Sequence, residues 1–218
     1  MNFFYNGHSS FVITTNSGTT ILTDPYNPNA YDNKLKYKVF DDEVDIVTIS
    51  HSHADHAYYD EVKGNPIILK NTGKFTVKEV EIFGVQTYHD QEQGNERGEN
   101  IVFVMKADDI TIAHLGDLGH VLTSEQAAEI GAVDIVMVPV GGTYTINSQE
   151  AWEVIGQLNS KAVIPMHFKT KKCEFPIQKV DEFLTGHSNI EYINGPSFDI
   201  SAETISDNIK IYVAEPGL

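Results

Sequence analysis

The stretch that decides the fold is Asp45-Ile46-Val47-Thr48-Ile49-Ser50, followed directly by His51-Ser52-His53-Ala54-Asp55-His56. Its first half is rich in β-branched residues and predicts a buried β-strand. Side chains two residues apart in an extended chain point to the same side, so we expect His51, His53 and Asp55 to share one face. His56 breaks this alternation and predicts a turn. Imidazole and carboxylate together bind zinc, and also iron or manganese, so the segment predicts a metal site; a polar surface loop is the alternative.

Three further residues of metal-ligand type also follow predicted strands. His89 comes after Val85–Tyr88, Asp117 after Thr111–Leu115, and His167 after Val163–Met166. In open α/β sheets, binding sites form beyond the carboxyl ends of the strands. A single histidine after a strand is more often a loop residue, but with the strand that leads into His51–His56 there are four such strand ends, which together are consistent with one shared site.

The rest of the chain alternates strands with helices. The predicted strands, apart from Asp45–Ser50, are Ser10–Thr15, Thr19–Thr23, Pro66–Lys70, Glu81–Tyr88, Ile101–Lys106, Ile110–His114, Asp134–Val140, Lys161–Met166 and Ile209–Val213. Capping boxes predict helices that begin at Thr123 and Asn147, and Pro176 predicts a third helix that runs to about Gly186. We expect an α/β fold with two sheets covered by helices, in a single domain of residues 1–218.

Composition narrows the function. The 218 residues carry 15 Lys+Arg against 31 Asp+Glu, a formal charge of −16, which argues against binding to duplex nucleic acid. The one cysteine, Cys173, excludes a disulfide scaffold and a zinc site of several cysteines. No apolar run has the length of a membrane span, and the first residues do not resemble a secretory signal, so we expect a cytoplasmic protein without a membrane partner.

Several motifs resemble the metallo-β-lactamase superfamily of metal hydrolases over nearly the whole chain. They are the His51–His56 segment, Gly7-His8-Ser9-Ser10-Phe11, Leu22-Thr23-Asp24-Pro25, Gly116-Asp117 and Pro165-Met166-His167. The chain looks most similar to the compact branch that includes L-ascorbate-6-phosphate lactonase. The resemblance implies a four-layer αβ/βα sandwich with a dinuclear metal site.

The same resemblance implies a set of metal ligands. His51, His53 and His89 would hold the first divalent ion, most simply Zn²⁺, with Mn²⁺ or Fe²⁺ as alternatives. Asp55, His56 and His167 would hold the second ion, and Asp117 would bridge the two. His114 also lies near Asp117 in the sequence and competes with His89 for the first site.

This ligand set predicts hydrolysis by a hydroxide that bridges the two metals, because such ions lower the pKa of bound water toward ~7. Asp117 and Asp55 would be the catalytic carboxylates, with Asp55 also accepting a proton. The expected substrate is a small anionic ester, lactone or phosphoester. An RNA or nucleotide phosphodiesterase and a non-catalytic metal-binding regulatory module remain as alternatives. The oxygen chemistry of di-iron relatives is disfavoured, since His53 stands where those proteins resemble a Glu.

Other residues are candidates for supporting the ligands or binding the substrate. Asp24 would accept the free N–H of a ligand histidine, unless it only forms the turn before Pro25. His8 and His114 either face the site or serve structural roles. Arg97, the only arginine, and the lysines from Lys169 to Lys172 would bind a substrate anion; the alternatives are a salt bridge to Glu96 or Glu99 and a solvated basic turn. Tyr144, after Gly141-Gly142, would contribute a phenol to the pocket; the alternative is that this segment is only a structural turn.

Overall fold

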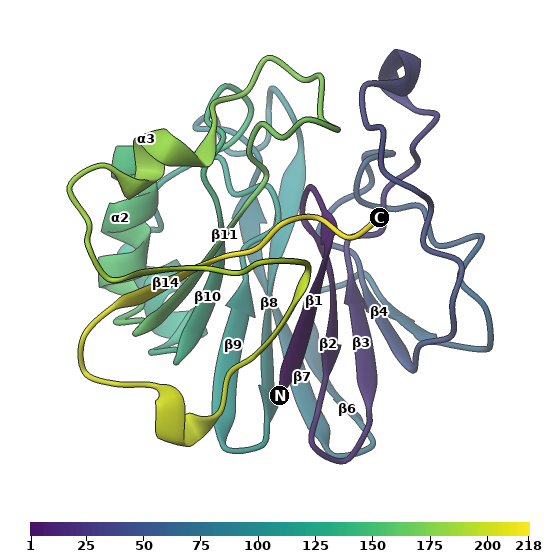
Figure 1. Cartoon of the computed structure of the whole chain (residues 1–218), viewed down its shortest axis with the longest axis horizontal. Coiled ribbons are helices and arrows are strands. Elements are labelled where there is room, and N and C mark those ends of the chain that lie inside the picture. The colour runs from purple at the N-terminus through teal and green to yellow at the C-terminus, as the bar shows by residue number, and fades with distance from the viewer.

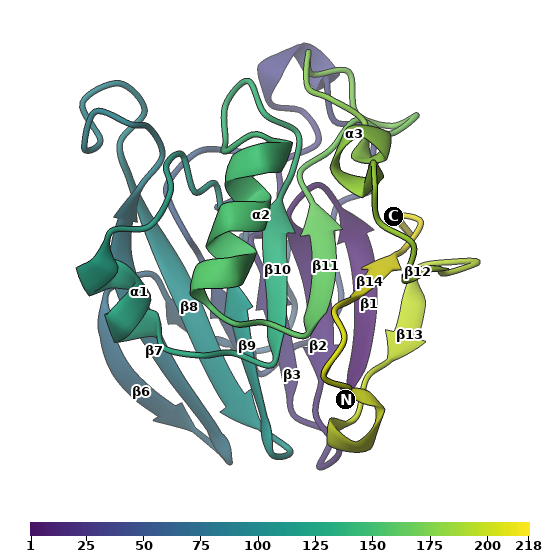
Figure 2. The ribbon, with the colours of Figure 1, turned by 90° about the vertical axis from the view of Figure 1, so that its left-hand side faces the viewer.

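The computed structural model describes all 218 residues and contains two β-sheets that share one hydrophobic core. The six-stranded sheet has the spatial order β13 (Ser197–Asp199), β1 (Asn2–Gly7), β2 (Ser10–Thr14), β3 (Thr20–Thr23), β4 (Ile46–Thr48) and β5 (Ile67–Leu69). The eight-stranded sheet has the order β12 (Ile190–Tyr192), β14 (Lys210–Val213), β11 (Ala162–Met166), β10 (Ile135–Pro139), β9 (Ile110–His114), β8 (Glu99–Ala107), β7 (Val80–Tyr88) and β6 (Gly73–Val77). Figures 1 and 2 show the two sheets packed against each other, with the N-terminal strands in purple.

Three helices lie over the outer face of the eight-stranded sheet (Figure 2): α1 (Ser124–Ile130), α2 (Ser148–Gln157) and α3 (Val180–Leu184). Both predicted capping boxes are present, because the Thr123 and Asn147 side chains accept N–H groups of the first turns of α1 and α2. The apolar stripe of α2, which includes Val154 and Ile155, is buried against the sheet as its helical spacing predicts.

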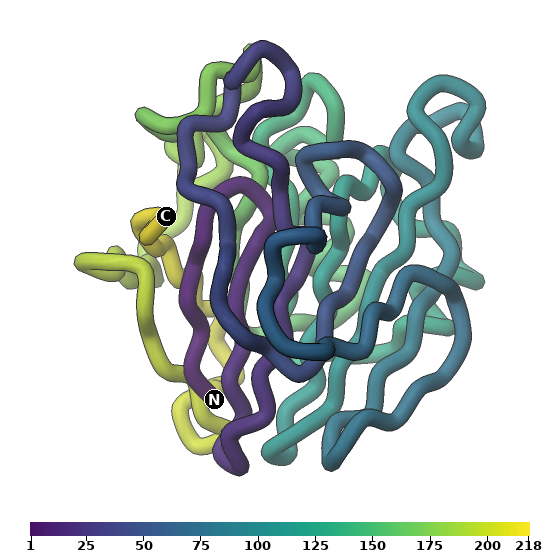
Figure 3. Tube along the Cα trace, turned by 90° about the vertical axis from the view of Figure 1, so that its right-hand side faces the viewer, coloured from purple at the N-terminus to yellow at the C-terminus, as the bar shows by residue number.

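The outer face of the six-stranded sheet is covered without an α-helix. Leu22 and Val47 of the sheet pack against Phe40 and Val62, which belong to long irregular connections. Figure 3 shows this face, where the purple and blue chain winds across the strands. Short 3₁₀ turns occur at Tyr31–Asn33 and Ala202–Thr204. The α/β fold class is therefore confirmed, but one of the two expected helical layers consists of loops.

The helix predicted from Pro176 is wrong in its first half, since α3 begins only at Val180. The Pro176 carbonyl accepts a hydrogen bond from Thr143 Oγ1 at 3.0 Å, and the Gln178 amide donates to the Gly141 carbonyl at 2.8 Å. These bonds tie the segment to the loop after β10, so the Pro176 carbonyl and the Gln178 amide are bonded outside any helix. Strand β1 was not predicted, because Phe4 between the buried Phe3 and Tyr5 conceals the alternation.

No helix is both long and apolar enough to cross a lipid bilayer. Cys173 is buried beneath the loops at one edge of the sheets, as expected for an ordinary apolar thiol.

Gly119, in the loop after β9, packs directly against the backbone of the loop after β7. A Cβ on Gly119 would lie 2.2 Å from the carbonyl carbon of His89 and 2.3 Å from the Asp90 nitrogen, so the backbone itself leaves no room. We predict that Gly119→Ala lowers the free energy of unfolding by about 1–3 kcal/mol, the usual cost of overpacking. Urea denaturation measures this effect.

The matched control is Gly156→Ala in α2, where a Cβ would meet nothing within 4 Å. This change should raise the free energy of unfolding by about 0.5–1 kcal/mol, because alanine loses less backbone entropy in a helix. Equal effects from the two substitutions would show that the close approach at Gly119 is not a constraint.

Candidate metal centre

All seven residues predicted to bind metal lie at one edge of the sandwich, beyond the carboxyl ends of strands. Strand β4 leads into the His51–His56 segment, β7 into His89, β9 into Asp117 and β11 into His167. The loops that leave these strands gather at the top of the molecule in Figure 1. Parallel and antiparallel pairing in the two sheets thus brings together side chains more than a hundred residues apart.

The His51–His56 segment forms a turn. The His53 carbonyl accepts the backbone N–H groups of His56 and Ala57 at 2.9 and 3.0 Å. The expectation that His51, His53 and Asp55 share one face is therefore wrong, because the turn points Asp55 elsewhere. It directs His51 and His53 to one group of ligand atoms, and Asp55 with His56 to another.

The first group consists of His51, His53 and His89, whose ligand atoms all lie within 4.8 Å of one another. His51 Nε2 is 3.0 Å from His53 Nδ1. Burial lowers the pKa of His51 and of His89. The two buried rings are therefore neutral at pH 7 and offer nitrogen lone pairs, the form that binds metal ions.

The second group consists of His8, Asp55, His56 and His167, which are all buried and also lie within 4.8 Å of one another. His56 Nε2 is 3.8 Å from Asp55 Oδ2. The sequence interpretation assigned three of these residues to a second ion, and the structure adds His8 beside them.

Asp117 lies between the two groups. Its Oδ2 atom is 3.3 Å from His89 Nε2 of the first group, and 3.1 and 3.2 Å from the Nε2 atoms of His56 and His167 of the second. A tetrahedral ion with bonds of about 2.0–2.1 Å separates its ligand atoms by about 3.3–3.4 Å. The distances around Asp117 are close to this value, so its carboxylate is placed to contact ions in both groups.

The electrostatics of this corner favour a cation. Burial would raise the pKa of Asp117, but the His167 and His56 rings outweigh burial and hold it well below its usual value. Burial would likewise lower the pKa of His56, yet the Asp117 and Asp55 carboxylates raise it well above its usual value. The ionised carboxylates thus create a negative potential that a bound cation would neutralise.

Asp24 fixes the orientation of one histidine in each group. Its Oδ1 accepts the Ser50 amide at 2.8 Å, and its Oδ2 lies 2.6 Å from Ser50 Oγ and 2.9 Å from His56 Nδ1. Ser50 Oγ is also 2.9 Å from His51 Nδ1. With protons on both Nδ1 atoms, His51 and His56 direct their Nε2 atoms into the site, where a bound ion would displace the second proton of His56, and metal-binding histidines adopt this arrangement.

The unpartnered atoms of the site test whether it fits metal ions. Asp117 Oδ1 is buried and has no hydrogen-bond partner in the protein, and His56 Nε2 lies 3.1 Å from Asp117 Oδ2 but outside hydrogen-bond geometry. Such atoms cost about 1–3 kcal/mol each when nothing satisfies them. Histidine and aspartate are ligands that zinc, iron and manganese accept, so the donor set fits divalent ions of this kind.

His8 connects two ligands of the second group. Its Nε2 is 3.2 Å from Asp55 Oδ2, its backbone carbonyl accepts the His167 amide at 2.9 Å, and its ring centroid lies 4.1 Å from that of His167. Burial lowers the pKa of His8 to about 4, so the ring is neutral at pH 7. A neutral ring with its proton on Nε2 donates to Asp55 and holds that carboxylate in place.

The backbone at three of these residues is left-handed, with φ of 57° at His8, 38° at Asp24 and 51° at His167. This conformation is uncommon for residues with side chains and costs about 1–3 kcal/mol each. It points the three side chains inward where each strand ends.

His114 does not reach the ligand groups. Its Nε2 lies 2.8 Å from the Ser9 carbonyl and its Nδ1 accepts the Gly116 amide at 3.3 Å, so both ring nitrogens are already bonded. The geometry therefore favours His89, and His114 braces the loops beside the site.

Lys169 does not face the site either. Its ammonium donates to the Phe175 carbonyl at 2.7 Å, and Lys172 donates to the carbonyl of Leu218. The expectation that Lys169 binds a substrate anion is therefore not supported, because its ammonium group is hydrogen-bonded to a backbone carbonyl.

A cavity of about 320 Å³ opens over the ligand groups. Arg97 and Tyr144 border it, as the sequence interpretation expects, together with His53, Asp55, His89, Asp117 and His167. Tyr31, Lys34 and Phe175 also border it and were not foreseen. For Lys34 the sequence did contain a signal, because Lys34, Lys36 and Lys38 are three lysines in a short run of an acidic chain.

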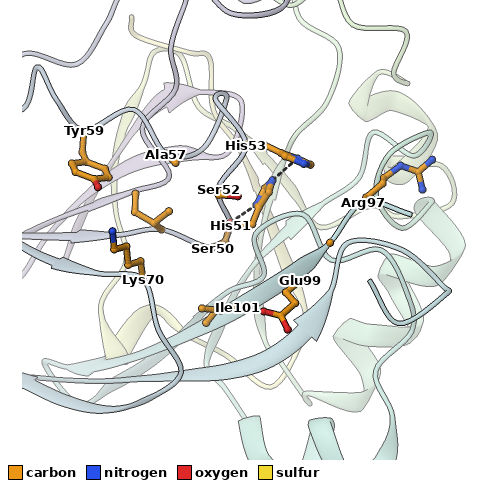
Figure 4. A pocket seen from close by; sticks show the side chains of 12 residues that line it. Ser50, His51, Ser52, His53, Ala57, Tyr59, Lys70, Arg97, Glu99 and Ile101 are labelled. Atoms are coloured by element: carbon orange, nitrogen blue, oxygen red, sulfur yellow. Dashed lines mark hydrogen bonds between the residues drawn. The ribbon is translucent and has the colours of Figure 1, made fainter. Parts of the chain in front are cut away.

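Arg97 also borders a second cavity of about 400 Å³ behind His51 and His53. In Figure 4 its guanidinium points away from Tyr59 and Lys70, which lie on the far side of that cavity. The loop that carries Arg97 is organised by Asp90, whose carboxylate accepts the backbone N–H groups of Glu92, Gly94, Glu96 and Arg97 at 2.7–3.0 Å. Arg97 also pairs with Glu96 at 3.3 Å, so both predicted roles remain compatible with the geometry.

The sequence matches a known protein family. The model of the beta-lactamase superfamily domain matches residues 2–167. A UPF0173 metal-dependent hydrolase from Pyrococcus furiosus is 31% identical over 192 residues, which cover 75% of this chain and 83% of that protein. The lactonase-like branch stays a prediction, because these relatives are named only as metal-dependent hydrolases.

Solved structures agree with this match. A protein from Thermotoga maritima, inferred to be a Zn-dependent hydrolase of the metallo-beta-lactamase superfamily, is 40% identical with a TM-score of 0.81, and the alignment covers 98% of each chain. Igni18, a metallo hydrolase from Ignicoccus hospitalis, is 21% identical with a TM-score of 0.64 over 100% of this chain and 96% of its own. The second likeness concerns the fold alone.

The two supporting side chains should affect metal binding differently. We predict that His8→Phe, which keeps a ring but removes the donor to Asp55, weakens metal binding only at the second ligand group, by about 10–100-fold. Asp24→Asn should weaken metal binding at both groups, because Asp24 orients His51 and His56. Chelator-competition titration of the metal-free protein measures both affinities.

His120→Phe is the matched control. His120 is close to Asp117 in the sequence, but its ring nitrogens lie within hydrogen-bond distance of the Val121 carbonyl and the Tyr88 amide. Metal affinity should therefore not change in this variant. If His8→Phe weakened both ions equally, a role limited to Asp55 would be refuted.

Proposed function

The chain belongs to the metallo-β-lactamase superfamily of metal-dependent hydrolases, and we propose that it uses two divalent ions, most simply Zn²⁺, to hydrolyse a small anionic ester, lactone or phosphoester. One observation carries the proposal. A single oxygen, Asp117 Oδ2, lies within 3.1–3.3 Å of the Nε2 atoms of His89, His56 and His167, which belong to two separate groups of ligand atoms.

When bound, two such ions would lower the pKa of water toward ~7, supply a nucleophile at neutral pH and stabilise negative charge on the attacked group. Asp117 spans the two groups and fixes their separation. Asp55 is held ionised, because the nearby His56 and the hydrogen bond from His8 outweigh burial and lower its pKa. The lowered pKa suits Asp55 to binding a metal ion and makes it a weak base, so we assign it as a ligand rather than as the proton acceptor.

The lining of the cavity supports a small and negatively charged substrate. A volume of about 320 Å³ is at the lower end of the usual range for ligand pockets, about 300–1,000 Å³. Lys34 and Arg97 border this cavity in a protein whose formal charge is −16. They would attract an anion to a surface that otherwise repels it. This acidity also disfavours RNA as the substrate.

We predict about two divalent ions per chain after reconstitution, measured by elemental analysis. A chelator should abolish hydrolysis, and Zn²⁺ or Mn²⁺ should restore it. Lactones, thioesters, phosphomonoesters and phosphodiesters form the substrate panel. One ion at full loading would contradict the dinuclear proposal, and two ions without hydrolysis of any substrate would favour a binding module.

Asp117→Asn tests the bridging carboxylate. The change keeps the side-chain volume but removes the negative charge between the two groups of ligands. We predict that kcat/KM falls by at least 10–100-fold while the circular dichroism spectrum is unchanged.

Asp60→Asn, at an exposed position of the six-stranded half, is the control for the same chemical change and should leave activity intact. Wild-type activity and metal content in Asp117→Asn would exclude Asp117 as the bridge.

A further inference from the structure

We propose that the turn of residues 31–34, with Phe175 and Tyr144, forms a subsite that binds a flat ring and a second anionic group of the substrate, away from the reacting bond. The proposal rests on the proposed function, since the subsite belongs to the same cavity. The substrate class it names is a small ester, lactone or phosphoester that carries an unsaturated ring and a separate carboxylate or phosphate.

The first support is the arrangement of aromatic rings along the cavity. Phe175 stands edge-on to Tyr31 with centroids 5.6 Å apart, and edge-on to Tyr144 with centroids 6.2 Å apart. Phe175 also lies 5.7 Å from the ring of His8, which reaches the second ligand group. Tyr31, Phe175 and Tyr144 therefore form an aromatic wall of the cavity that also holds the metal ligands, and aromatic walls of this kind favour flat ligands.

The second support is the backbone at Tyr31. Tyr31, Asp32 and Asn33 have φ of 51°, 57° and 56°, three consecutive left-handed residues. Asp and Asn tolerate this conformation, but a bulky tyrosine does so rarely, and such strain concentrates at binding sites. The Tyr31 ring borders the cavity and remains 44% exposed; its hydroxyl faces the Asp55 carboxylate, and the exposed part of the ring is free to contact a ligand.

Packing from both sides fixes this turn over the site. The Asn27 amide donates to the Ala54 carbonyl at 2.8 Å and the Tyr58 amide to the Pro25 carbonyl at 2.8 Å, on either side of Asp55. On the other side, Leu35 forms a β-bridge with Cys173 above a small apolar cluster. The turn is thus attached both to the segment of a metal ligand and to the loop that carries Phe175.

The third support is the free charge of Lys34. Its ammonium has no carboxylate within 4.0 Å, although the protein is strongly acidic. Its backbone carbonyl accepts the Glu174 amide at 2.7 Å, which sets its position next to the cavity. Lys36, two residues later, pairs with Glu174 instead. Lys34 is therefore available to an anion, and Arg97 borders the same cavity.

A series of phosphonates that adds one group at a time tests the parts of this subsite separately. Their C–P bond is not an ester bond, so they serve as ligands and not as substrates. Methylphosphonate supplies only a group for the metals, phenylphosphonate adds a ring, and 4-carboxyphenylphosphonate adds a distal carboxylate. Calorimetric titration of the metal-loaded protein should show affinity rising by about 2- to 10-fold with the ring and by about 10-fold or more with the carboxylate.

Two substitutions should each remove one of the two gains in affinity along the phosphonate series. Tyr31→Leu should abolish the gain from the ring, while Tyr31→Phe keeps it. Lys34→Met should abolish the gain from the carboxylate, while Lys34→Arg keeps it. Lys36→Met is the matched control and should change nothing. Methylphosphonate should bind all five variants as it binds the wild type.

The outcomes separate the two proposals. If Lys34→Met and Tyr31→Leu bind the whole series like the wild type, the subsite is refuted even when the protein hydrolyses esters. If Lys34→Met weakens the binding of methylphosphonate as much as that of the larger ligands, Lys34 acts on the phosphonate at the metal centre and not on a distal anion, and the subsite is again refuted. If the stepwise losses appear but no ester, lactone or phosphoester is hydrolysed, the subsite stands and the proposed function fails.

Discussion

The carboxylate of Asp24 is the constraint on which the candidate metal centre depends. It is fully buried and lies where β3 ends, and the Asp24 amide donates to the Thr48 carbonyl of the neighbouring β4 at 2.9 Å. Through Ser50 and His56 it orients one histidine of each ligand group. A buried ionised carboxylate is stable only when fully hydrogen-bonded, so the same bonds that satisfy Asp24 also orient the ligands.

The two sheets provide the rigidity that this arrangement needs. Left-handed backbone at His8, Asp24 and His167 is unfavourable, and each of these residues directly follows a paired strand (β1, β3 and β11) that holds the chain where it turns. The energetic cost of this backbone conformation is confined to the strand ends, where the side chains point into the site. The shared apolar core between the sheets then holds residues from both halves of the chain in one place.

The site divides into a base, whose residues lie at or shortly after the ends of strands, and a rim, whose residues lie farther out in the loops. The base holds the His and Asp residues, which are nearly all buried, and its chemistry is suited to hydrolysis in general. The rim consists of Tyr31, Lys34, Arg97, Tyr144 and Phe175, from loops after β3, β7, β10 and β11. Loops tolerate change better than strands, so relatives with the same base are free to differ in the substrates that their rims select.

Local pattern was enough for much of this protein. The alternation and β-branched residues at Ile110–His114 and the capping boxes of Thr123 and Asn147 predicted elements that the structure contains, because strand pleat and helix ends impose their own spacing. Density of histidine at His51–His56 also indicated a site. Tertiary structure decided which atoms meet: the turn that separates Asp55 from His53, the choice of His89 over His114, and the exchange of Lys169 for Lys34 at the cavity. These outcomes depend on backbone hydrogen bonds between segments distant in the sequence, and no local pattern of residues encodes where such a bond will turn a side chain.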